Sequence, residues 1–579
     1  MRHDNPDSDN ESENSLDLDV DRVQGRGLLR NGSGDDHHED DPLPSPTDAA
    51  PQKQEPVKWR DLPNKQQLAI ITIARMSEPL VQTSLQSYMF YQLKWFDPSL
   101  SDATISSQAG VLHASFMAAQ FVTAMLWGRI ADSKFAGRKT VLLIGLLGTS
   151  ASCVGFGFST TFWQALVFRT LGGATNGNIG VMRTMVSEIV REKKYQARAF
   201  LLLPMCFNIG VIIGPILGGM LSDPAGSYPS LFGNIEFFVK FPYAAPNILS
   251  SVFLLISALA VWLGLEETLD ALSDDPPDVG SRIGHRLAIW YRKHFGSSPT
   301  DDGYSSIPAS DVELTGADAP AAKKKPTKRY TQRLPFRRIF TRNVGLTLFA
   351  QFFLTFHVGT FNSLWFVFLS TPVYDPAKSD HTTRLPFHFT GGLGLQPRFV
   401  GTAMAILGVI GISMQLLLYP QLSARLGTIK SWRYFLLYFP LVYFLVPYLS
   451  VVPSTSLPPA SKTGPAIWIS IFFVLLIQVT GRTFTLPSQV ILVNNCSPHP
   501  SVLGTVHGLG QSVSSAARTI GPMVGGLVYG FGLSHGFVGL VWWILSGVAV
   551  CACLTSLMVR EGDGHEIWLE GDEEDEENK

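Results

Sequence analysis

The sequence predicts an all-α membrane protein with twelve transmembrane helices in two pseudo-symmetric six-helix bundles. Apolar spans of ~20 residues, the length that crosses a bilayer as a helix, recur along the chain. The sequence is 46% hydrophobic and 16% charged, and most charges gather in the tails and one central segment. A glycine–proline pattern occurs once in each half of the chain. These three observations indicate a duplicated membrane bundle.

The glycine–proline pattern predicts close helix packing. Gly210, Gly214 and Gly218 recur every fourth residue, with Pro215 after the second and Gly219 after the third. Small residues at this spacing share one helix face and let another backbone approach closely in lipid. The proline removes a backbone donor and kinks the helix. The second half repeats the pattern as Ala517, Gly521, Pro522, Gly525 and Gly526.

Twelve candidate spans divide the chain into five regions. The first six are 66–91, 106–131, 140–159, 162–189, 197–221 and 242–265. The second six are 343–370, 398–421, 432–452, 465–493, 502–531 and 535–558. We therefore expect a disordered tail over 1–58, an N-terminal bundle over 59–266, a central linker over 267–341, a C-terminal bundle over 342–560 and an acidic tail over 561–579.

The distribution of Lys and Arg predicts the orientation. Basic residues gather in the links after the second, fourth and eighth spans and in the central linker, whereas the opposite links are poor in them. Basic links face the cytosol in membrane proteins. Both termini are therefore expected in the cytosol, which agrees with an even number of spans. The sequence does not separate the plasma membrane from the vacuolar membrane, and we take the plasma membrane as the expectation.

The sequence of the tails and of the central linker does not predict a binding or catalytic site. Residues 1–56 are acidic and rich in Ser, Pro and Gly, with no apolar core, so they predict a disordered tail and no signal peptide. Residues 283–294 of the central linker could form an amphipathic helix on the membrane surface; a solvated linker with a lipid-facing basic end is the favoured interpretation. The acidic end, Glu570–Lys579, is expected to be disordered. The five cysteines lie within or beside apolar spans and predict packing residues rather than a metal site. No cofactor is expected.

Charges inside apolar spans are costly and indicate function. Arg75 and Glu78 lie three residues apart in the first span, on one helix face, and Arg169 lies in the fourth. Two interpretations stay open: a salt bridge from Glu78 to Arg75 or Arg169 that orients helices, or a Glu78 carboxylate that gains and loses a proton as the cavity opens to each side. The residues expected to couple protons or line a central cavity are Arg75, Glu78, Arg169, Asn176, Asn208, His357 and Asn362. Arg183, Arg482 and Arg518 are further charges within spans.

The loop after the second span is the strongest local signal. It contains Gly128, Asp132, Gly137, Arg138 and Lys139. This segment resembles the signature loop of the major facilitator superfamily, with two additional residues between Asp132 and Gly137. The resemblance implies that the aspartate meets a helix N-terminus and nearby basic groups, latching the cytosolic side closed; such a contact contributes ~0.3–1 kcal/mol. The expected target is the eleventh span, which begins near Ser501.

Four further segments narrow the resemblance. Arg169–Gly173 resembles a superfamily motif whose arginine is implicated in proton coupling, and Gly210–Gly219 resembles the motif of the drug:proton antiporter branch. The residues from Arg169 to Glu188, and those from Asn494 to His507 with Gly508 and Ser512 to Gly526, are similar to the fungal and plant group of zinc-induced-facilitator-like proteins, which does not make zinc the substrate. The resemblance covers about residues 66–560 and implies small organic molecules, metal chelates or cations as substrates. The long acidic tail and linker are more typical of fungi than of bacteria.

Together these patterns predict a proton-coupled exporter of a drug, toxin or metabolite that works by alternating access. In this scheme Glu78 and Arg169 carry or tune the proton, and Asp132 and Arg138 control the cytosolic latch. One alternative is a proton-coupled or facilitative importer of a nutrient or chelate, which the glycine–proline pattern disfavours. Another is a non-transporting membrane sensor, which would have no need of its intramembrane charges. We find no nucleophile triad, metal cluster or phosphate loop, so an enzyme is not expected. The expected partners are the substrate, protons and lipid, without nucleic acid, and the expected state is a monomer.

Overall fold

The structure is a computed structural model. It describes residues 59–100, 102–272, 276, 278–295, 330, 332–376, 383–395, 397–458, 460–570 and 572. All of these belong to one compact unit, Gln54–Lys579. The predicted N-terminal tail over 1–58 therefore lies outside the described residues, as does most of the linker between 296 and 331.

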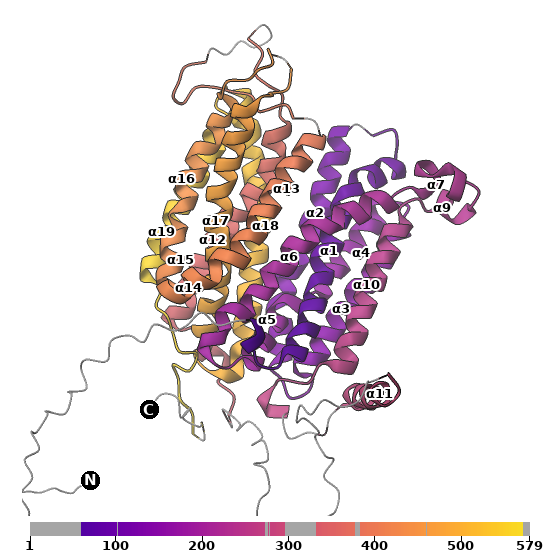
Figure 1. Ribbon diagram of the computed structural model, residues 1–579, viewed down its shortest axis with the longest axis vertical. Coiled ribbons are helices and arrows are strands. Elements are labelled where there is room, and N and C mark those ends of the chain that lie inside the picture. The colour runs from indigo at the N-terminus through magenta and orange to yellow at the C-terminus, as the bar shows by residue number, and fades with distance from the viewer. Residues whose placement is uncertain are drawn as a thin grey trace, which may run out of the picture. The chain divides into compact units, whose positions relative to one another are not determined.

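The first six predicted spans form one helical bundle, drawn from indigo to magenta in Figure 1. Its long helices are α1 (Lys65–Phe96), α2 (Asp102–Ala131), α3 (Gly137–Gly157), α4 (Phe162–Thr175), α5 (Asn178–Ile189), α6 (Lys193–Leu221) and α10 (Ala244–Gly264). The fourth predicted span is divided into α4 and α5 by a break at Asn176 and Gly177. Three short helices, α7 (Pro224–Ser227), α8 (Pro229–Phe232) and α9 (Glu236–Lys240), connect α6 to α10.

The last six predicted spans form a second bundle, drawn from orange to yellow. Its elements are α12 (Arg342–Ser370), α13 (Pro397–Ser413), a π-helical turn η4 (Met414–Leu418), α14 (Tyr419–Leu426), α15 (Thr428–Leu436), α16 (Tyr438–Leu445), the 3-10 turn η5 (Val446–Ser450), α17 (Pro465–Asn495), α18 (Leu503–Ser534) and α19 (Leu540–Met558). Buried tryptophans fill its core, among them Trp365, Trp432 and Trp542.

Every predicted span coincides with one helix or with a run of consecutive helices, and within the described residues the β-structure amounts to isolated bridges. Nine helical segments of the described chain are long and apolar enough to cross a membrane. The other three predicted spans are α1, the α4–α5 pair and α18. Both α1 and α18 carry charged and polar residues, and the break at Asn176 leaves α4 and α5 short.

In each half of the chain, the glycine face of the fifth span of that half packs against the first span of that half. A Cβ at Gly210 would lie 2.8 Å from Pro79 Cβ on α1, and one at Gly214 would overlap Thr83 Oγ1 and lie 2.8 Å from the Leu80 carbonyl oxygen. In the second half, a Cβ at Gly521 would overlap Thr360 Oγ1 of α12. The fifth span thus packs on the first, and the eleventh packs on the seventh in the same way. The two halves therefore share a helix contact, as expected for the duplicated bundle that the sequence predicts.

Gly219 does not belong to the packed face, so its predicted packing role is wrong. A Cβ at Gly219 would meet no atom within 4 Å, and the same holds for Gly526 in the second half. Each glycine follows a packed glycine directly, and one residue turns a helix by about 100°, from the 3.6 residues in each turn. The side of the helix that carries Gly219 and Gly526 therefore faces away from the neighbouring backbone.

Helix α11 (Val279–Phe295) lies within the predicted central linker. It begins beside the end of α10, where Gly280 and Gly284 lie directly against the carbonyl oxygens of Trp262 and Leu263 (Figure 1). The structure thus shows a helix where the favoured interpretation was a solvated linker. Its position on a membrane surface stays a prediction.

The segment that precedes the acidic end packs against the second bundle, whereas most of Glu570–Lys579, for which disorder was expected, lies outside the described residues. The Gly564 amide donates to the Asn495 carbonyl at 2.9 Å, and the Ile567 amide donates to the Pro498 carbonyl at 2.9 Å. These contacts hold residues 562–569 against the end of α17 and the turn that precedes α18. Residues 571 and 573–579 lie outside the described chain.

Candidate functional site

A central cavity of about 210 Å³ lies between the two bundles. Helices α1, α5 and α6 of the first bundle and α12, α13, η4, α17 and α18 of the second contribute its walls. The apolar part of the wall includes Phe207, Leu354, Val358 and Leu407. The polar part consists of Arg75, Arg183, Asn208, Gln351, Thr355, Asn362, Gln415, Arg482, Thr483, Gln489, Gln511, Ser514 and Arg518.

Polar side chains join the bundles around this cavity. Asn208 of α6 accepts a hydrogen bond from Arg482 Nη2 at 3.1 Å and donates to Gln415 Oε1 at 3.1 Å. Gln120 of α2 accepts from Gln511 Nε2 at 3.0 Å and from Ser515 Oγ at 2.8 Å. Because a buried polar group that loses its partner is costly, these contacts must be replaced by water or substrate when the bundles separate.

Glu78 does not line the cavity itself, but it contacts Arg75, which does. The Arg75 Nη1 atom donates to Glu78 Oε2 at 2.7 Å, and both side chains are about one-tenth exposed. Arg169 does not take part in this pair. Its Nη2 atom donates to Gln82 Oε1 at 2.5 Å, one helical turn along α1, and its guanidinium lies 4.5 Å from the centre of the Phe116 ring. Of the two partners expected for Glu78, the structure places Arg75 beside it.

Three of the seven residues expected at the cavity line it directly: Arg75, Asn208 and Asn362. His357 does not, and its predicted place is wrong. Its Nδ1 atom lies 3.0 Å from Tyr443 Oη and its ring packs on Phe439, within the core of the second bundle. Asn176 lies at the break between α4 and α5, where its carbonyl accepts from Gln120 and its buried side chain has no partner among the described residues.

Three further cations line the cavity that the sequence did not place there. Arg183, Arg482 and Arg518 all contribute to the wall. Their position within apolar spans was a signal for function, but no local motif indicated which helix face each would occupy. The glutamines Gln351, Gln415 and Gln511 were missed for the same reason.

A second cluster connects α2 to the N-terminus of α18. The Asp132 carboxylate accepts from the Gly504 amide at 2.9 Å and the Thr505 amide at 2.6 Å, and also from the Thr505 hydroxyl and Arg138. Arg138 in turn donates to Glu188 Oε1 at 2.9 Å. A carboxylate at the first turn of a helix satisfies free amides and interacts favourably with the helix dipole. We call the side of the protein that holds this cluster the Asp132 end.

Glycines allow the backbones to meet at this cluster. A Cβ at Gly128 would overlap the Gly504 carbonyl oxygen and lie 3.0 Å from Gly508 Cα. Gly137 begins α3 with a φ of +73°, which favours glycine. The longer turn between Asp132 and Gly137 therefore still brings the Arg138 side chain to the Asp132 carboxylate.

The start of α3 is also tied to the central linker. Lys139 Nζ lies 2.9 Å from Asp278 Oδ1 and donates to Ser281 Oγ at 2.9 Å, at the beginning of α11. The Glu267 carboxylate accepts from the Arg138 and Lys139 amides at 2.9 and 3.0 Å. Burial acts to raise the pKa of Asp278, but the hydrogen bonds from Ser281 and Lys139 together outweigh it, so this pKa is lowered.

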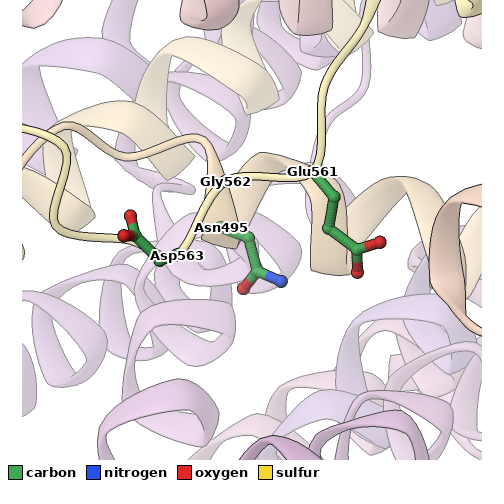
Figure 2. Close-up of a pocket in the computed structure, with 4 residues that line it drawn as sticks. All are labelled: Asn495, Glu561, Gly562 and Asp563. Carbon is green, nitrogen blue, oxygen red and sulfur yellow. The ribbon is translucent and has the colours of Figure 1, made fainter. Parts of the chain in front are cut away.

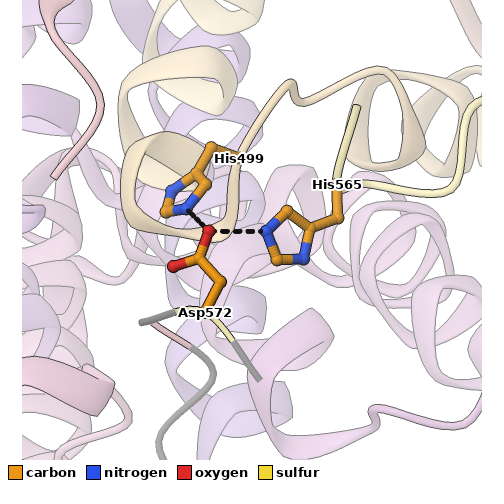
Figure 3. Close-up of side chains that lie close together, drawn as sticks. All are labelled: His499, His565 and Asp572. Atoms are coloured by element: carbon orange, nitrogen blue, oxygen red, sulfur yellow. Dashed lines mark hydrogen bonds and ion pairs between the residues drawn. The ribbon is translucent and has the colours of Figure 1, made fainter. Parts of the chain in front are cut away.

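The ordered tail forms two further clusters at the Asp132 end. Figure 2 shows Asn495 beside the 561–563 segment, where these residues line an open pocket. In Figure 3, the imidazoles of His499 and His565 both point at the Asp572 carboxylate, with Nε2–Oδ2 distances of 3.0 and 3.2 Å. Burial lowers the pKa of His499, although Asp572 opposes this effect. The ligand-type atoms of the three residues lie within 4.8 Å of one another, but both imidazoles already have a carboxylate partner.

Two six-helix bundles around a central polar cavity, joined at one end by a carboxylate on a helix N-terminus, define a membrane transporter. The sequence profile of the Major Facilitator Superfamily matches residues 69–522. The chain belongs to this superfamily. Membership confirms the prediction of a transporter rather than an enzyme.

Relatives place the chain near the predicted branch. It is 33% identical over 529 residues to the major facilitator superfamily multidrug transporter mfsB of Aspergillus fumigatus, covering 87% of this chain and 85% of that protein. It is 26% identical over 466 residues to ZINC INDUCED FACILITATOR 1 of Arabidopsis thaliana, covering 80% and 84%. The structure of the human organic anion transporter MFSD10 aligns with a TM-score of 0.56 at 16% identity, over 85% of this chain and 99% of that chain. The structural likeness shows the fold.

Proposed function

We propose that this protein exports a small organic molecule by proton-coupled alternating access, as a drug:proton antiporter. The observation that carries the proposal is the central cavity between the two bundles, with the Arg75–Glu78 pair at its wall. A polar site at the interface of two repeats can be exposed alternately when the bundles rock. The similarity to a protein named a multidrug transporter supports export.

In this scheme the Asp132 end is cytosolic. The basic residues of the loop after the second span and of α11 support this orientation, because such residues are retained on the cytosolic side. Asp132 holds the N-terminus of α18 while that end is closed. When the bundles rock, the carboxylate leaves Gly504 and Thr505, and the cavity opens to the cytosol to take up its cargo. We place the protein in the plasma membrane.

Glu78 is the proposed proton carrier. In its charged form it pairs with Arg75, and protonation on the outer side would release that arginine. The pair could then form again when the proton leaves to the cytosol. A carboxylate that changes partner with protonation links the proton gradient to the conformation of the cavity.

The test is transport by the full chain in proteoliposomes with an imposed pH gradient. Glu78→Gln should abolish proton-driven transport and spare exchange of labelled substrate, because Gln keeps the size of the side chain but cannot ionise. Glu192→Gln, a change at a half-exposed residue outside the cavity, is the matched control. Proton-driven transport that persists in Glu78→Gln would rule out this role for Glu78. Absence of substrate-dependent proton flux in the wild type, across a broad panel of compounds, would favour a sensor.

Proton-coupled uptake is the second candidate. The contact between Arg75 and Glu78 at the cavity wall favours it. Protonation of Glu78 leaves Arg75 without its carboxylate, which increases the positive charge of the cavity. An anionic cargo would then bind more tightly together with the proton, and the two would cross in the same direction. Antiport and uptake predict opposite directions of substrate movement in the same inward proton gradient, so the proteoliposome experiment separates them.

A further inference from the structure

The central cavity holds far more positive than negative charge. Four arginines contribute to its wall: Arg75, Arg183, Arg482 and Arg518. The helical segments that line the cavity contain two carboxylates, Glu78 and Glu188. Glu78 is paired with Arg75, and Glu188 is paired with Arg138 at the Asp132 end. Three arginines therefore face the cavity without an ion pair in the described chain, and the Glu78 carboxylate, already paired with Arg75, also attracts Arg183 and Arg518 without contacting them.

The hydrogen bonds of these three arginines do not neutralise them. Arg482 donates to the Asn208 amide oxygen, and Arg518 donates to the Ser514 carbonyl at 3.4 Å within its own helix. Arg183 makes no ion pair among the described residues. The three side chains come from α5, α17 and α18, so both bundles contribute cations to one space. A salt bridge that orients helices therefore does not explain why these three arginines lie in the cavity wall.

Positive charges held together at membrane depth are costly unless a counter-charge accompanies them. A guanidinium offers a planar set of donors that matches a carboxylate or a sulfonate. The apolar part of the wall, with Phe207 and Leu354, suits the rest of an organic molecule. We infer that the cavity binds an organic anion, in which a carboxylate or sulfonate group sits among Arg183, Arg482 and Arg518 on an apolar body. The inference rests on the proposed function only in taking this cavity as the substrate site.

The position of the arginines also gives the anion a part in the transport cycle. Arg183 belongs to the first bundle, whereas Arg482 and Arg518 belong to the second. Without an anion these like charges repel across the interface and oppose its closure. An anion between them attracts both bundles at once, so its binding would favour the closed cavity. Transport of an anion, rather than of a neutral or cationic analogue, would follow from this difference in charge.

The test compares compounds that share one aromatic body and carry an anionic, a neutral or a cationic group on it. The full chain in lipid nanodiscs is heated with 2-naphthoate, 2-naphthamide or 2-naphthylmethylammonium, and with the same three forms built on indole-3-acetate and on cinnamate. The carboxylates should raise the Tm in a saturable manner, and the amides and amines should not. Arg482→Gln and Arg518→Gln should each weaken carboxylate binding by about tenfold or more, the effect of losing one charged hydrogen-bond partner. Equal effects of the three forms, or no effect of any carboxylate, would overturn the inference.

Two controls separate loss of the anion site from loss of fold. Arg425→Gln changes an exposed arginine of α14 outside the cavity and should leave carboxylate binding unchanged. Without carboxylate, the Tm of Arg518→Gln should stay level or rise, because repulsion is relieved. A lower Tm together with unaltered carboxylate binding would argue against the anion site.

Binding and transport give independent outcomes. Arginine-dependent binding of carboxylates in nanodiscs, without transport in proteoliposomes, would keep the anion site and reject the proposed transport. Transport of the neutral and charged forms at equal rates would keep the transporter and reject the anion site.

Discussion

Asp132 is the residue on which the contact between the two bundles depends most directly. Its carboxylate serves two backbone amides of α18, the Thr505 hydroxyl and Arg138 at once. The side chains of Asp132 and Arg138 are fully buried. A buried charge with this number of partners stabilises the closed Asp132 end strongly, and its removal leaves Arg138 with Glu188 alone.

Asp132→Asn should therefore open the Asp132 end. The amide keeps one acceptor but loses the charge, so we expect a loss of about 1.5–3 kcal/mol from the closed state, the range for hydrogen bonds to charged groups. Alkylation of a cysteine introduced at Met125, which lies on the α2–α18 interface, would report this opening as a faster rate. Asp278→Asn, in which the lost carboxylate partner is Lys139, is the matched control. An unchanged rate in Asp132→Asn would contradict the assigned contact.

At the scale of elements, the packing of α6 on α1 distinguishes glycines that are close together in sequence. Gly214 lies against Thr83 and the Leu80 carbonyl, whereas Gly219 faces open space. Gly214→Ala should lower the Tm, because the added methyl forces the helices apart at a cost of about 1–3 kcal/mol. Gly219→Ala should leave the Tm unchanged or raise it slightly, since alanine favours helix.

The second half provides a repeat of this experiment. Gly521→Ala should behave as Gly214→Ala, and Gly526→Ala as Gly219→Ala, because α18 packs on α12 in the same manner. Thermal unfolding in detergent would measure all four. Equal effects of the packed and open glycines would show that the small-residue face does not determine helix distance.

At the scale of the whole molecule, the sequence predicted the spans because their signal is local. Apolar length, glycine spacing and the loop with Asp132 each lie within a short stretch of chain. The rotation of each helix is decided by distant packing, so the sequence could not tell that Arg518 faces the cavity while His357 faces Tyr443. The order of the tail was missed for a similar reason. Its contacts join Asp572 to His499, which are far apart in the chain.

The two bundles should open as rigid bodies, and a pair of substitutions tests this. Gln120 accepts from Gln511 and Ser515 across the interface, deeper than Asp132. Gln120→Leu removes the acceptor of both donors in the closed state and leaves Gln511 Nε2 with the longer hydrogen bond to Ser515 Oγ at 3.4 Å, which should cost about 1–3 kcal/mol. If opening is one two-state motion, Asp132→Asn and Gln120→Leu shift the same equilibrium and their free energies add in the double variant. Spin-label distances between α2 and α18, measured at both depths, would then increase together. Asp132→Asn could instead lengthen the distance at the Asp132 end and leave the deeper distance unchanged. The Asp132 end would then open locally while the two bundles stay together around the cavity, and rigid-body opening would be wrong.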